Sequence, residues 1–288
     1  MQVALVGLGV MGRAAATALR SAGHEVTASD PMPGAAERAA AVGAGFAATA
    51  GEASRGAEAI LLFLPGPAQI RAVVPEVSAA APSGSVIVDH STADPETARD
   101  MAEVAEAAGL GWVDAPVLGR PAAVGKWAHP VGQTPGALAQ VEPVLRSYAA
   151  AIFEVGGPGA GHTVKLLNQM MFGAINAMTA EMMSISSRLG LPPGRLFEII
   201  TASQAGTVSN LFRELGQRIA DERYDDPTFS VALLEKDIRL GLEMARAAGA
   251  NPRLGTVVAS MNEDAIARGL GASDTSAMWK VTDAPDGA

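Results

Sequence analysis

The chain has 288 residues, of which 49% are apolar and 18% are charged, which suits a globular protein of about two domains. Its net charge of −9 and pI near 5.0 argue against nucleic acid or a membrane surface as the main partner, because both favour a basic face. The absence of cysteine excludes disulfides, thiolate nucleophiles and cysteine-ligated zinc, and a cytoplasmic location is expected.

Targeting and metal signals are also missing from the sequence. The N-terminus runs directly into a strand-like segment, without the basic and apolar stretches of a signal peptide. No apolar run approaches the roughly 20 residues of a membrane-spanning helix. The four histidines, His24, His90, His129 and His162, show no metal-ligand spacing, so we expect no metal site and interpret them as ordinary surface or loop residues.

Short apolar segments alternate with alanine-rich segments over the first half of the chain. This alternation predicts an α/β fold, with a parallel sheet covered by helices on both faces. The predicted strands are residues 3–6, 25–29, 60–64, 86–89, 112–114 and 152–155. Helices are predicted between them at residues 13–22, 35–42 and 95–108.

The pattern changes at the glycine-rich segment 156–161, after which only helices are predicted, at residues 163–189, 193–202, 210–221, 229–248 and 252–268. We therefore expect a dinucleotide-binding Rossmann domain, residues 1–162, and an all-helical domain for substrate binding and dimerisation, residues 163–288, joined by the long helix. A long helix this rich in Met predicts packing between subunits, in a homodimer or homotetramer. Disorder is expected for residues 283–288.

The first predicted strand leads into Gly7-Leu8-Gly9-Val10-Met11-Gly12, and a helical segment follows. In this Gly-x-Gly-x-x-Gly motif, Gly7 permits a tight turn, Gly9 lets the backbone approach a pyrophosphate, and Gly12 allows close packing of helix on strand. The N–H groups at the start of the helix would bind the phosphates. The motif in this context predicts a dinucleotide site.

Asp30 ends the second predicted strand, 18 residues after Gly12. That spacing is near the roughly 20 residues expected for a carboxylate that binds the ribose hydroxyls. Such a carboxylate repels a 2′-phosphate, and the next basic residue along the chain is Arg38. We therefore expect NAD in preference to NADP.

Two further segments follow predicted strands, at the carboxyl ends where an open α/β sheet binds its ligand. One is Leu64-Pro65 and the other is Asp89-His90-Ser91-Thr92. Thr92 could reach the cofactor ribose or the substrate. Alternatively, Ser91 or Thr92 caps the helix that starts near Pro95.

Lys165 is predicted in the first turn of the long helix. A cation there opposes the helix macrodipole, and partial burial at a domain cleft would lower its pKa further. Such a lysine is suited to exchange a proton with an alcohol oxygen while hydride moves to or from a nicotinamide; a solvated surface lysine is the alternative. Asn168 and Gln169 lie three and four residues further on, so one or both would share its helix face.

Several motifs in order resemble the β-hydroxyacid dehydrogenases, which include 3-hydroxyisobutyrate dehydrogenase and sulfolactaldehyde reductase, over nearly the whole chain. They are Gly7–Gly12 with Met11, Asp89-His90-Ser91-Thr92 with Pro95, Asp114-Ala115-Pro116-Val117, residues 156–169 carrying Lys165, residues 229–237 ending in Lys236-Asp237 with Leu240 beyond, and Asp274-x-Ser276-Ala277. The resemblance implies a nicotinamide cofactor and a small anionic 3-hydroxy acid, or the matching aldehyde, as substrate. It implies that Lys165 is the catalytic acid–base and that the cofactor contacts include Leu64, Pro65, Thr92, Phe229 and Lys236.

Two positions depart from the family pattern. Where the family has Ser-Gly-Gly, which holds the substrate carboxylate, this chain has Leu118-Gly119-Arg120. Arg120 could replace the lost contact, because a guanidinium binds an acidic group bidentately, and a sulfonate or phosphonate head is conceivable; a solvent-facing loop arginine is the alternative. Gln169 stands where many members have a substrate-binding Asn. We expect Gly119, Arg120, Asn168 and Gln169 to bind the substrate.

These features predict an NAD-dependent hydroxyacid dehydrogenase or semialdehyde reductase. An imine reductase is an alternative of similar fold, but such enzymes usually carry another residue at the position of Lys165. A dinucleotide-binding sensor without catalytic activity is a further alternative, which Lys165 and Lys236 together disfavour.

Overall fold

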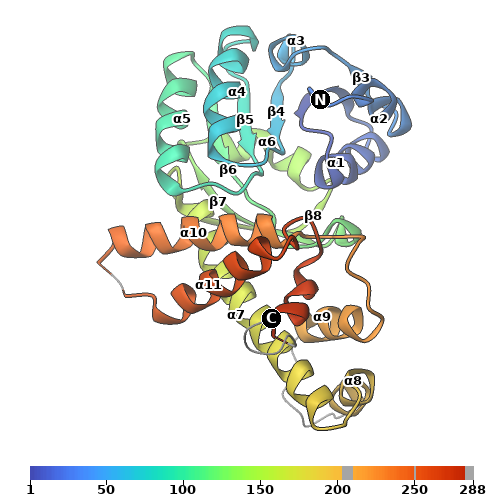
Figure 1. The fold of residues 1–288 in the computed structure, drawn as a ribbon. Coiled ribbons are helices and arrows are strands. Elements are labelled where there is room, and N and C mark those ends of the chain that lie inside the picture. Colours follow the sequence, from blue (N-terminus) through green and yellow to red (C-terminus); the bar gives the residue numbers. More distant parts are fainter. Residues whose placement is uncertain (203–209, 250, 283–288) are drawn as a thin grey trace. The chain divides into compact units, whose positions relative to one another are not determined.

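The computed structural model describes residues 1–202, 210–249 and 251–282 (Figure 1). The chain divides into two compact units, Met1–Lys165 and Leu166–Ala288, which we call the first and second units. The expected disorder of residues 283–288 lies outside the described residues.

The first unit is built on an eight-stranded sheet, in the order β3-β2-β1-β4-β5-β6-β7-β8. All neighbouring strands pair in parallel except β6 and β7, which are antiparallel. The strands are β1 (Gln2–Val6), β2 (Glu25–Ser29), β3 (Gly45–Phe46), β4 (Ala59–Leu62), β5 (Val86–Asp89), β6 (Gly111–Asp114), β7 (Trp127–Gln133) and β8 (Ala149–Gly156). The predicted Rossmann-type sheet is thereby confirmed.

Helices cover both faces of this sheet. They are α1 (Val10–Ser21), α2 (Ala35–Ala41), α3 (Ala50–Ser54), α4 (Pro67–Ala80), α5 (Pro95–Ala107), the short 3₁₀ helix η1 (Pro121–Ala123) and α6 (Ala137–Leu145). Helices α1, α2 and α5 lie where the sequence predicts them. The predictions omit α4 and α6, each of which contains an internal proline that normally disfavours a helix.

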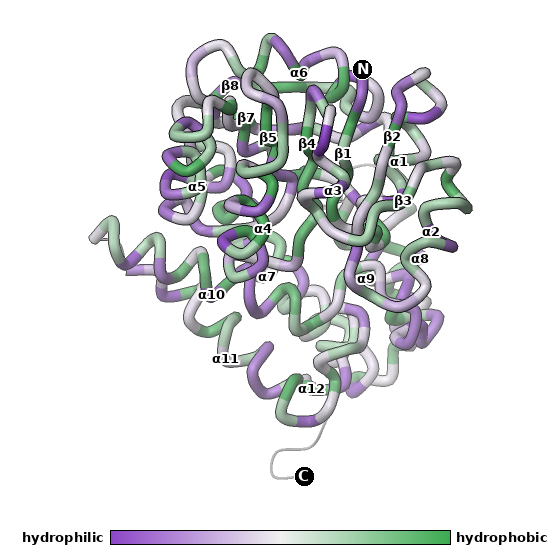
Figure 2. The backbone as a smooth tube through the Cα atoms, turned by 90° about the horizontal axis from the view of Figure 1, so that it is seen from above, coloured by the Kyte–Doolittle hydropathy of each residue, from purple (hydrophilic) through white to green (hydrophobic). Residues whose placement is uncertain are grey.

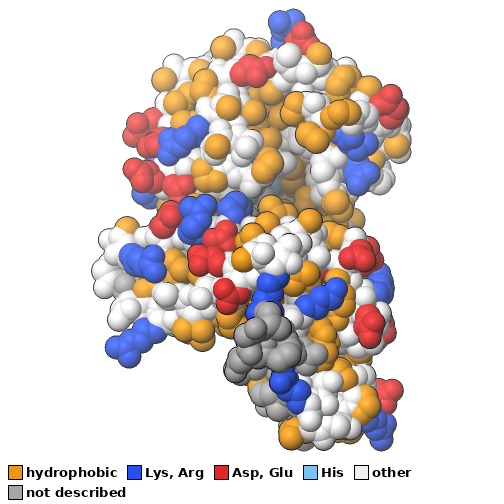
Figure 3. All heavy atoms as spheres, in the orientation of Figure 1, with side chains coloured by type: hydrophobic (Ala, Val, Ile, Leu, Met, Phe, Trp, Pro, Cys, Tyr) orange, Lys and Arg blue, Asp and Glu red, His pale blue; other side chains and the backbone are white. Residues whose placement is uncertain are grey.

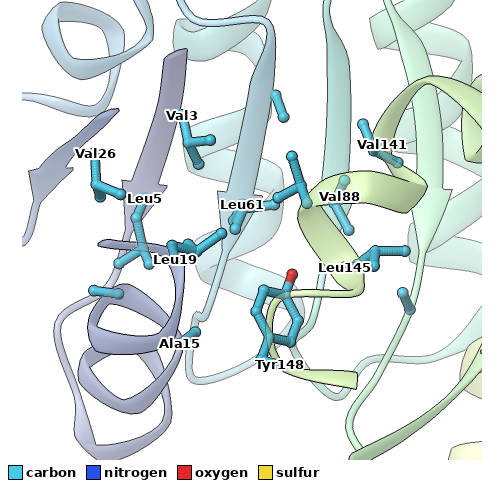
Figure 4. Packing of buried hydrophobic residues seen from close by; sticks show 14 of the residues in the cluster. Val3, Leu5, Ala15, Leu19, Val26, Leu61, Val88, Val141, Leu145 and Tyr148 are labelled. Atoms are coloured by element: carbon cyan, nitrogen blue, oxygen red, sulfur yellow. The ribbon is translucent and has the colours of Figure 1, made fainter. Parts of the chain in front are cut away.

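The central strands consist largely of apolar residues, as Figure 2 shows for β1, β4 and β5, and these apolar side chains are buried. Alternate side chains enter two separate cores, because successive residues of a strand point to opposite faces. Val3 and Leu5 of β1 pack in one core with residues of α1 and α6 (Figure 4), whereas Ala4 and Val6 pack in the other with residues of α4 and α5.

Strands β3 and β7 are absent from the predictions. β7 contains Pro130 and Gly132, which usually weaken a strand. Gly132 is required here by packing, since a Cβ at this position would lie 2.5 Å from the carbonyl oxygen of Gly157 and 2.6 Å from Oδ1 of Asp114. Tertiary contact therefore overrides local propensity at β7.

Helix α7 (Ala160–Arg188) starts in the first unit and continues in the second. The second unit also contains α8 (Pro193–Ala202), α9 (Asn210–Ala220), α10 (Val231–Ala247), α11 (Arg253–Ala267), η2 (Thr275–Met278) and α12 (Trp279–Thr282). Its described residues form helices and no strand, as predicted. No helix of the described chain has the length and apolarity needed to span a membrane.

Candidate cofactor and catalytic site

The glycine motif forms a tight cradle between β1 and α1. Gly7 has a φ of +102°, and a Cβ there would lie 2.2 Å from the carbonyl oxygen of Phe63 at the end of β4. A Cβ on Gly12 would lie 1.9 Å from the carbonyl oxygen of Gly7. Gly9 differs, because the structure places no described atom beyond its neighbours within 4 Å of its Cβ position. Two glycines thus close the turn, and the third leaves open space for a ligand.

The start of α1 faces this open space. Gly9 is the N-cap, and no side chain of the described residues caps the helix. The first intrahelical hydrogen bond runs from Arg13 N to Gly9 O, so the preceding N–H groups have no acceptor within the helix. Val10 is 56% exposed. Unpaired N–H donors on a positive helix end fit the pyrophosphate of a dinucleotide.

Asp30 lies directly after β2 and ties this cradle to the second strand. Its Oδ2 accepts a hydrogen bond from Leu8 N at 2.7 Å, and its Oδ1 accepts one from Met32 N at 2.8 Å. Arg38 Nη2 also lies 3.2 Å from Oδ1. An ionised carboxylate offers about four acceptor positions, so with these three contacts about one position, on Oδ2, remains for a ribose hydroxyl. Arg38 follows Asp30 at some distance along the chain, yet the turn into α2 brings its guanidinium to the carboxylate.

The segments after β4 and β5 are joined to each other by Ser91. Its Oγ accepts a hydrogen bond from Leu64 N at 2.9 Å, and its own N–H donates to Asp89 Oδ1 at 2.9 Å. The alternative, in which Ser91 or Thr92 caps the helix near Pro95, is wrong, because Asp94 caps α5 by accepting from Thr97 N at 2.7 Å. Ser91 instead connects the segment after β5, which contains Thr92, to the segment after β4, which contains Pro65.

Three fully buried side chains form an ionic network where β5, β6 and α7 meet. His162 Nε2 lies 3.1 Å from Asp89 Oδ2. Asp114 accepts hydrogen bonds from Gly159 N at 2.8 Å and from His162 N at 3.1 Å, so it caps the start of α7 from another strand. The motifs that contain these residues do not by themselves indicate this pairing, and the interpretation of His162 as a surface or loop histidine is wrong because its side chain is fully buried.

The pKa values of this network follow from burial and pairing. Burial disfavours the charged form of His162, but the hydrogen bond and charge of Asp89 outweigh it and raise its pKa above 6.5. Burial likewise disfavours ionised Asp89, yet hydrogen bonds from His162 and Ser91 hold its pKa below 3.8. For Asp114, burial is the larger effect and raises the pKa.

Lys165 contacts the segment that follows β6. Its Nζ donates a hydrogen bond to the carbonyl oxygen of Val117 at 2.8 Å, and the side chain is half-buried. The structure thus joins the Asp114–Val117 motif to the motif around Lys165. The predicted position in the first helical turn is wrong, because capping by Asp114 lets α7 begin at Ala160 inside the glycine-rich segment. Lys165 lies in the second turn, beyond the strongest part of the helix dipole.

The segment Leu118-Gly119-Arg120, which departs from the family pattern, is hydrogen-bonded to β7. Leu118 and Ala128 exchange backbone hydrogen bonds of 2.9 and 3.2 Å, and Trp127 Nε1 donates to Arg120 O at 2.8 Å. A Cβ on Gly119 would lie 2.5 Å from Cδ1 of Trp127. Gly119 is therefore required by Trp127, which belongs to no predicted element because β7 has no clear strand pattern in the sequence.

In the second unit, Asp237 joins two predicted site residues. It accepts a hydrogen bond from Gln169 Nε2 at 2.8 Å through Oδ2, and Lys236 Nζ lies 2.8 Å from its Oδ1. Asn168 Nδ2 donates to Gln169 Oε1 at 3.4 Å. Asp237 is buried, and its role in joining these residues is not indicated by its motif in the sequence.

The two remaining motif positions have structural partners. Phe229 precedes α10 rather than lying in it, and its ring meets Phe172 edge-to-face with centroids 5.7 Å apart. Asp274 caps η2 by accepting from Ser276 N at 3.1 Å and Oγ at 2.8 Å. Among the described side chains, no group of three His, Asp or Glu residues is arranged to hold a metal ion.

The strand order and the glycine cradle at the carboxyl end of β1 define the first unit as a dinucleotide-binding domain. Residues 2–157 match the NAD-binding domain of 6-phosphogluconate dehydrogenase. Residues 159–282 match the NAD-binding model of NADP-dependent 3-hydroxyisobutyrate dehydrogenase. The chain belongs to the 3-hydroxyisobutyrate dehydrogenase family of NAD(P)-dependent enzymes, as the resemblance implied.

Individual relatives cover almost the whole chain. The 3-hydroxyisobutyrate dehydrogenase of Pseudomonas aeruginosa is 34% identical over 90% of each protein, and the 3-sulfolactaldehyde reductase of Escherichia coli is 28% identical over 96% of this chain and 94% of the relative. The crystal structure of 3-hydroxyisobutyrate dehydrogenase from Salmonella typhimurium has a TM-score of 0.90 at 31% identity, over 97% of this chain and 99% of that one.

Imine reductases are more distant. The enzyme from Bacillus cereus has a TM-score of 0.61 at 18% identity, over 98% of this chain and 99% of that one, which shows a shared fold alone. The comparisons therefore favour the hydroxyacid dehydrogenase prediction over the imine reductase alternative.

Proposed function

We propose that this protein transfers hydride between NAD and the alcohol carbon of a small 3-hydroxy acid, or reduces the matching semialdehyde, with Lys165 as acid–base. The observation that carries the proposal is the hydrogen bond from Lys165 Nζ to Val117 O at 2.8 Å. This bond holds an amine beside the segment that follows β6, at the carboxyl ends of the strands, where this fold binds its ligands.

The chain's own residues have separable tasks in this proposal. The Gly7–Gly12 cradle holds the pyrophosphate and Asp30 holds the ribose, while Leu64, Pro65, Thr92, Phe229 and Lys236 remain predicted cofactor contacts. The bound nicotinamide supplies or accepts the hydride. Lys165 gives or takes the proton at the substrate oxygen. The hydrogen bond to Val117 O fixes the position of the Lys165 amine from which this proton would move.

We further propose that Arg120 binds the anionic head of the substrate. The hydrogen bond from Trp127 Nε1 to its carbonyl oxygen fixes the Arg120 backbone and so limits where the guanidinium can reach. Gly119, Asn168 and Gln169 remain predicted substrate contacts. A sulfonate head is a second candidate, favoured by Arg120 at this departure and by the relative named 3-sulfolactaldehyde reductase.

A homodimer or homotetramer in the cytoplasm is part of the proposal. The exposed apolar side chains Met171, Met178 and Met182 recur on α7 at spacings of seven and four residues, which places them on one face of the helix. Figure 3 shows apolar side chains at the surface of the helical unit. A second copy of the chain would cover such a stripe.

A substrate panel tests the function. The purified protein with NAD is offered 3-hydroxyisobutyrate, serine, glycerate and threonate, and with NADH it is offered glyoxylate, succinic semialdehyde, sulfolactaldehyde and a cyclic imine. We expect turnover of at least one pair. Binding of NADH without turnover of any substrate would support the sensor alternative, and reduction of a cyclic imine alone would support an imine reductase.

A further inference from the structure

Four buried rings form a cluster against the segment that follows β6. Trp127 and His129 belong to β7, His90 follows β5, and Tyr148 follows α6; all four are at most 5% exposed. The centroids of His90 and His129 lie 5.0 Å apart, and that of Tyr148 lies 5.5 Å from His90 and 5.8 Å from His129. We call these residues the ring cluster. Figure 4 shows Tyr148 among the buried apolar residues of this core.

The hydrogen bonds of the ring cluster determine its protonation. The carbonyl oxygen of Ala115 lies 2.6 Å from His90 Nδ1 and 2.9 Å from His129 Nδ1. A carbonyl has no proton to donate, so each Nδ1 must carry one. Burial lowers the pKa of His90 to about 3 and that of His129 to about 4, so both rings are neutral at pH 7. Each Nε2 is then an acceptor, and Tyr148 donates its hydroxyl proton to His90 Nε2 across 2.7 Å.

His129 is an unusual choice for a packing residue. Its Nε2 is buried and has no hydrogen-bond partner among the described residues. An unsatisfied buried acceptor is costly, and an aliphatic side chain would avoid that cost. The hydrogen bond from Nδ1 to Ala115 is the compensating contact that the structure shows.

Ala115 is close in the chain to the carbonyl that holds Lys165. Val117, two residues further on, accepts the Lys165 Nζ hydrogen bond, and Leu118 then pairs with Ala128 of β7. The segment 115–118 is thus fixed by the imidazoles and β7, and it in turn orients the amine. A displacement of this segment would move the amine relative to the substrate oxygen.

We propose that His129 and His90 are positioning residues for proton transfer, which act on Lys165 through the Ala115–Val117 backbone. This inference rests on the proposed role of Lys165. It extends the site to β7, which carries His129, and to the segment after β5, which carries His90. Neither histidine needs to touch substrate or cofactor in this role. A misplacement of about 1 Å can cost on the order of a hundredfold in rate, so the effect should appear in kcat.

The first test compares His129→Leu with His129→Asn. An asparagine amide can donate from near the position of the imidazole Nδ1, whereas leucine fills the space without a donor. We expect His129→Leu to lower kcat at least tenfold while KM and the Kd for NADH stay within about twofold, and His129→Asn to retain at least a third of kcat. A kcat within twofold of wild type for His129→Leu, or an asparagine variant as slow as the leucine variant, overturns the proposal.

A second variant covers the case in which His129→Leu fails to fold. Tyr148→Phe keeps the ring and removes only the hydroxyl that donates to His90 Nε2. We expect a loss of kcat of about threefold or more with unchanged NADH affinity, because a buried Nε2 left without its donor weakens the hydrogen-bonded chain that runs from Tyr148 through His90 to Ala115. An unchanged kcat in a folded Tyr148→Phe protein contradicts the proposal.

Nitrogen-15 NMR of the histidines gives a readout that does not depend on activity. The chain has four histidines, so the His90 and His129 signals can be assigned from the Tyr148→Phe and His129→Asn proteins. We expect both in the Nδ1–H tautomer, unchanged between about pH 5.5 and 8, because each pKa lies well below this range. An Nε2–H tautomer, or titration near 6.5, refutes the assignment. Normal turnover of Lys165→Ala would refute the proposed function instead, and would leave these spectra unchanged.

Discussion

Asp89 and His162 form an ion pair, 3.1 Å long, with both side chains fully buried. The pair joins the end of β5 to the start of α7, the helix that carries Lys165. Asp114 caps the same helix start. Two carboxylates and an imidazole therefore hold the beginning of α7 against the sheet edge at which the cofactor is proposed to bind.

Replacing Asp89 should destabilise the protein in a pH-dependent way. Because the pKa of His162 is raised in the folded state, its contribution is complete below 6.5 and is lost as pH rises through the folded pKa. The lowered pKa of Asp89 gives a contribution that is complete above 3.8 and is lost as pH falls through its folded pKa. We expect Asp89→Asn to reduce the free energy of unfolding by about 3–5 kcal/mol near pH 5–6, and by less above pH 8.

Urea unfolding of wild type and Asp89→Asn at several pH values measures this difference. The free energies of unfolding of the two proteins are compared at each pH, because His90 and His129 add a pH dependence of opposite sign to both proteins. These histidines are buried and neutral, so their contribution to stability is lost as pH falls below 6.5. A difference that stays constant from pH 5 to 9 would show that the pair does not titrate with unfolding.

Lys165→Ala should lose at least a hundredfold in kcat, because general acid–base catalysis contributes about 10²–10⁴-fold. The Kd for NADH, from fluorescence titration, should change by less than about twofold. Lys126→Ala is a matched control, since Lys126 is an exposed lysine of the first unit. Near-normal turnover of Lys165→Ala would remove the central residue of the proposal.

Asp30 and Arg38 should control the choice between NAD and NADP. We expect wild type to bind NADH more tightly than NADPH, and Asp30→Asn to reduce that preference about tenfold because the repulsion of a 2′-phosphate is lost. Arg38 lies 3.2 Å from Asp30 and is the cation nearest in sequence to it, so Arg38→Ala should weaken NADPH more than NADH. Dissociation constants for both cofactors decide this, and tighter NADPH binding by wild type would overturn the preference.

Arg120→Ala should raise KM for the anionic substrate about 10- to 100-fold, the size of a lost charged hydrogen bond. Trp127→Phe removes the indole N–H donated to Arg120 O but keeps a ring beside Gly119, so we expect a rise of about threefold to tenfold. Trp112→Phe is the control, since Trp112 is equally buried and its Nε1 has no partner in the described structure. Equal KM values for Arg120→Ala and wild type would place the anion elsewhere.

Met178→Glu should dissociate the proposed oligomer, because a charge would enter the centre of the apolar stripe on α7. Size-exclusion chromatography with light scattering measures the molar mass. Leu233→Glu serves as control, because Leu233 is also exposed but belongs to α10. A wild-type protein that is monomeric at micromolar concentration would exclude the interface.

Local sequence determined much of the fold and the cofactor half of the site. The glycine motif, the apolar runs of β1, β4 and β5, and the helical periodicity after residue 160 act over a few neighbouring residues, so they can be predicted without knowing the rest of the chain. Asp30, which directly follows β2, could be predicted in the same way, because its spacing from the glycines follows from one βαβ unit.

Tertiary structure decided the contacts between distant segments. Asp89 pairs with His162 across 73 residues, and His90 meets Tyr148 across 58. β7 forms despite Pro130 because packing and pairing with its neighbours outweigh its poor strand propensity. Arg38 reaches Asp30 only because the chain turns back into α2. Such contacts depend on the order of the strands in the sheet and on burial in a low-dielectric interior. Neither can be predicted from a local pattern in the sequence.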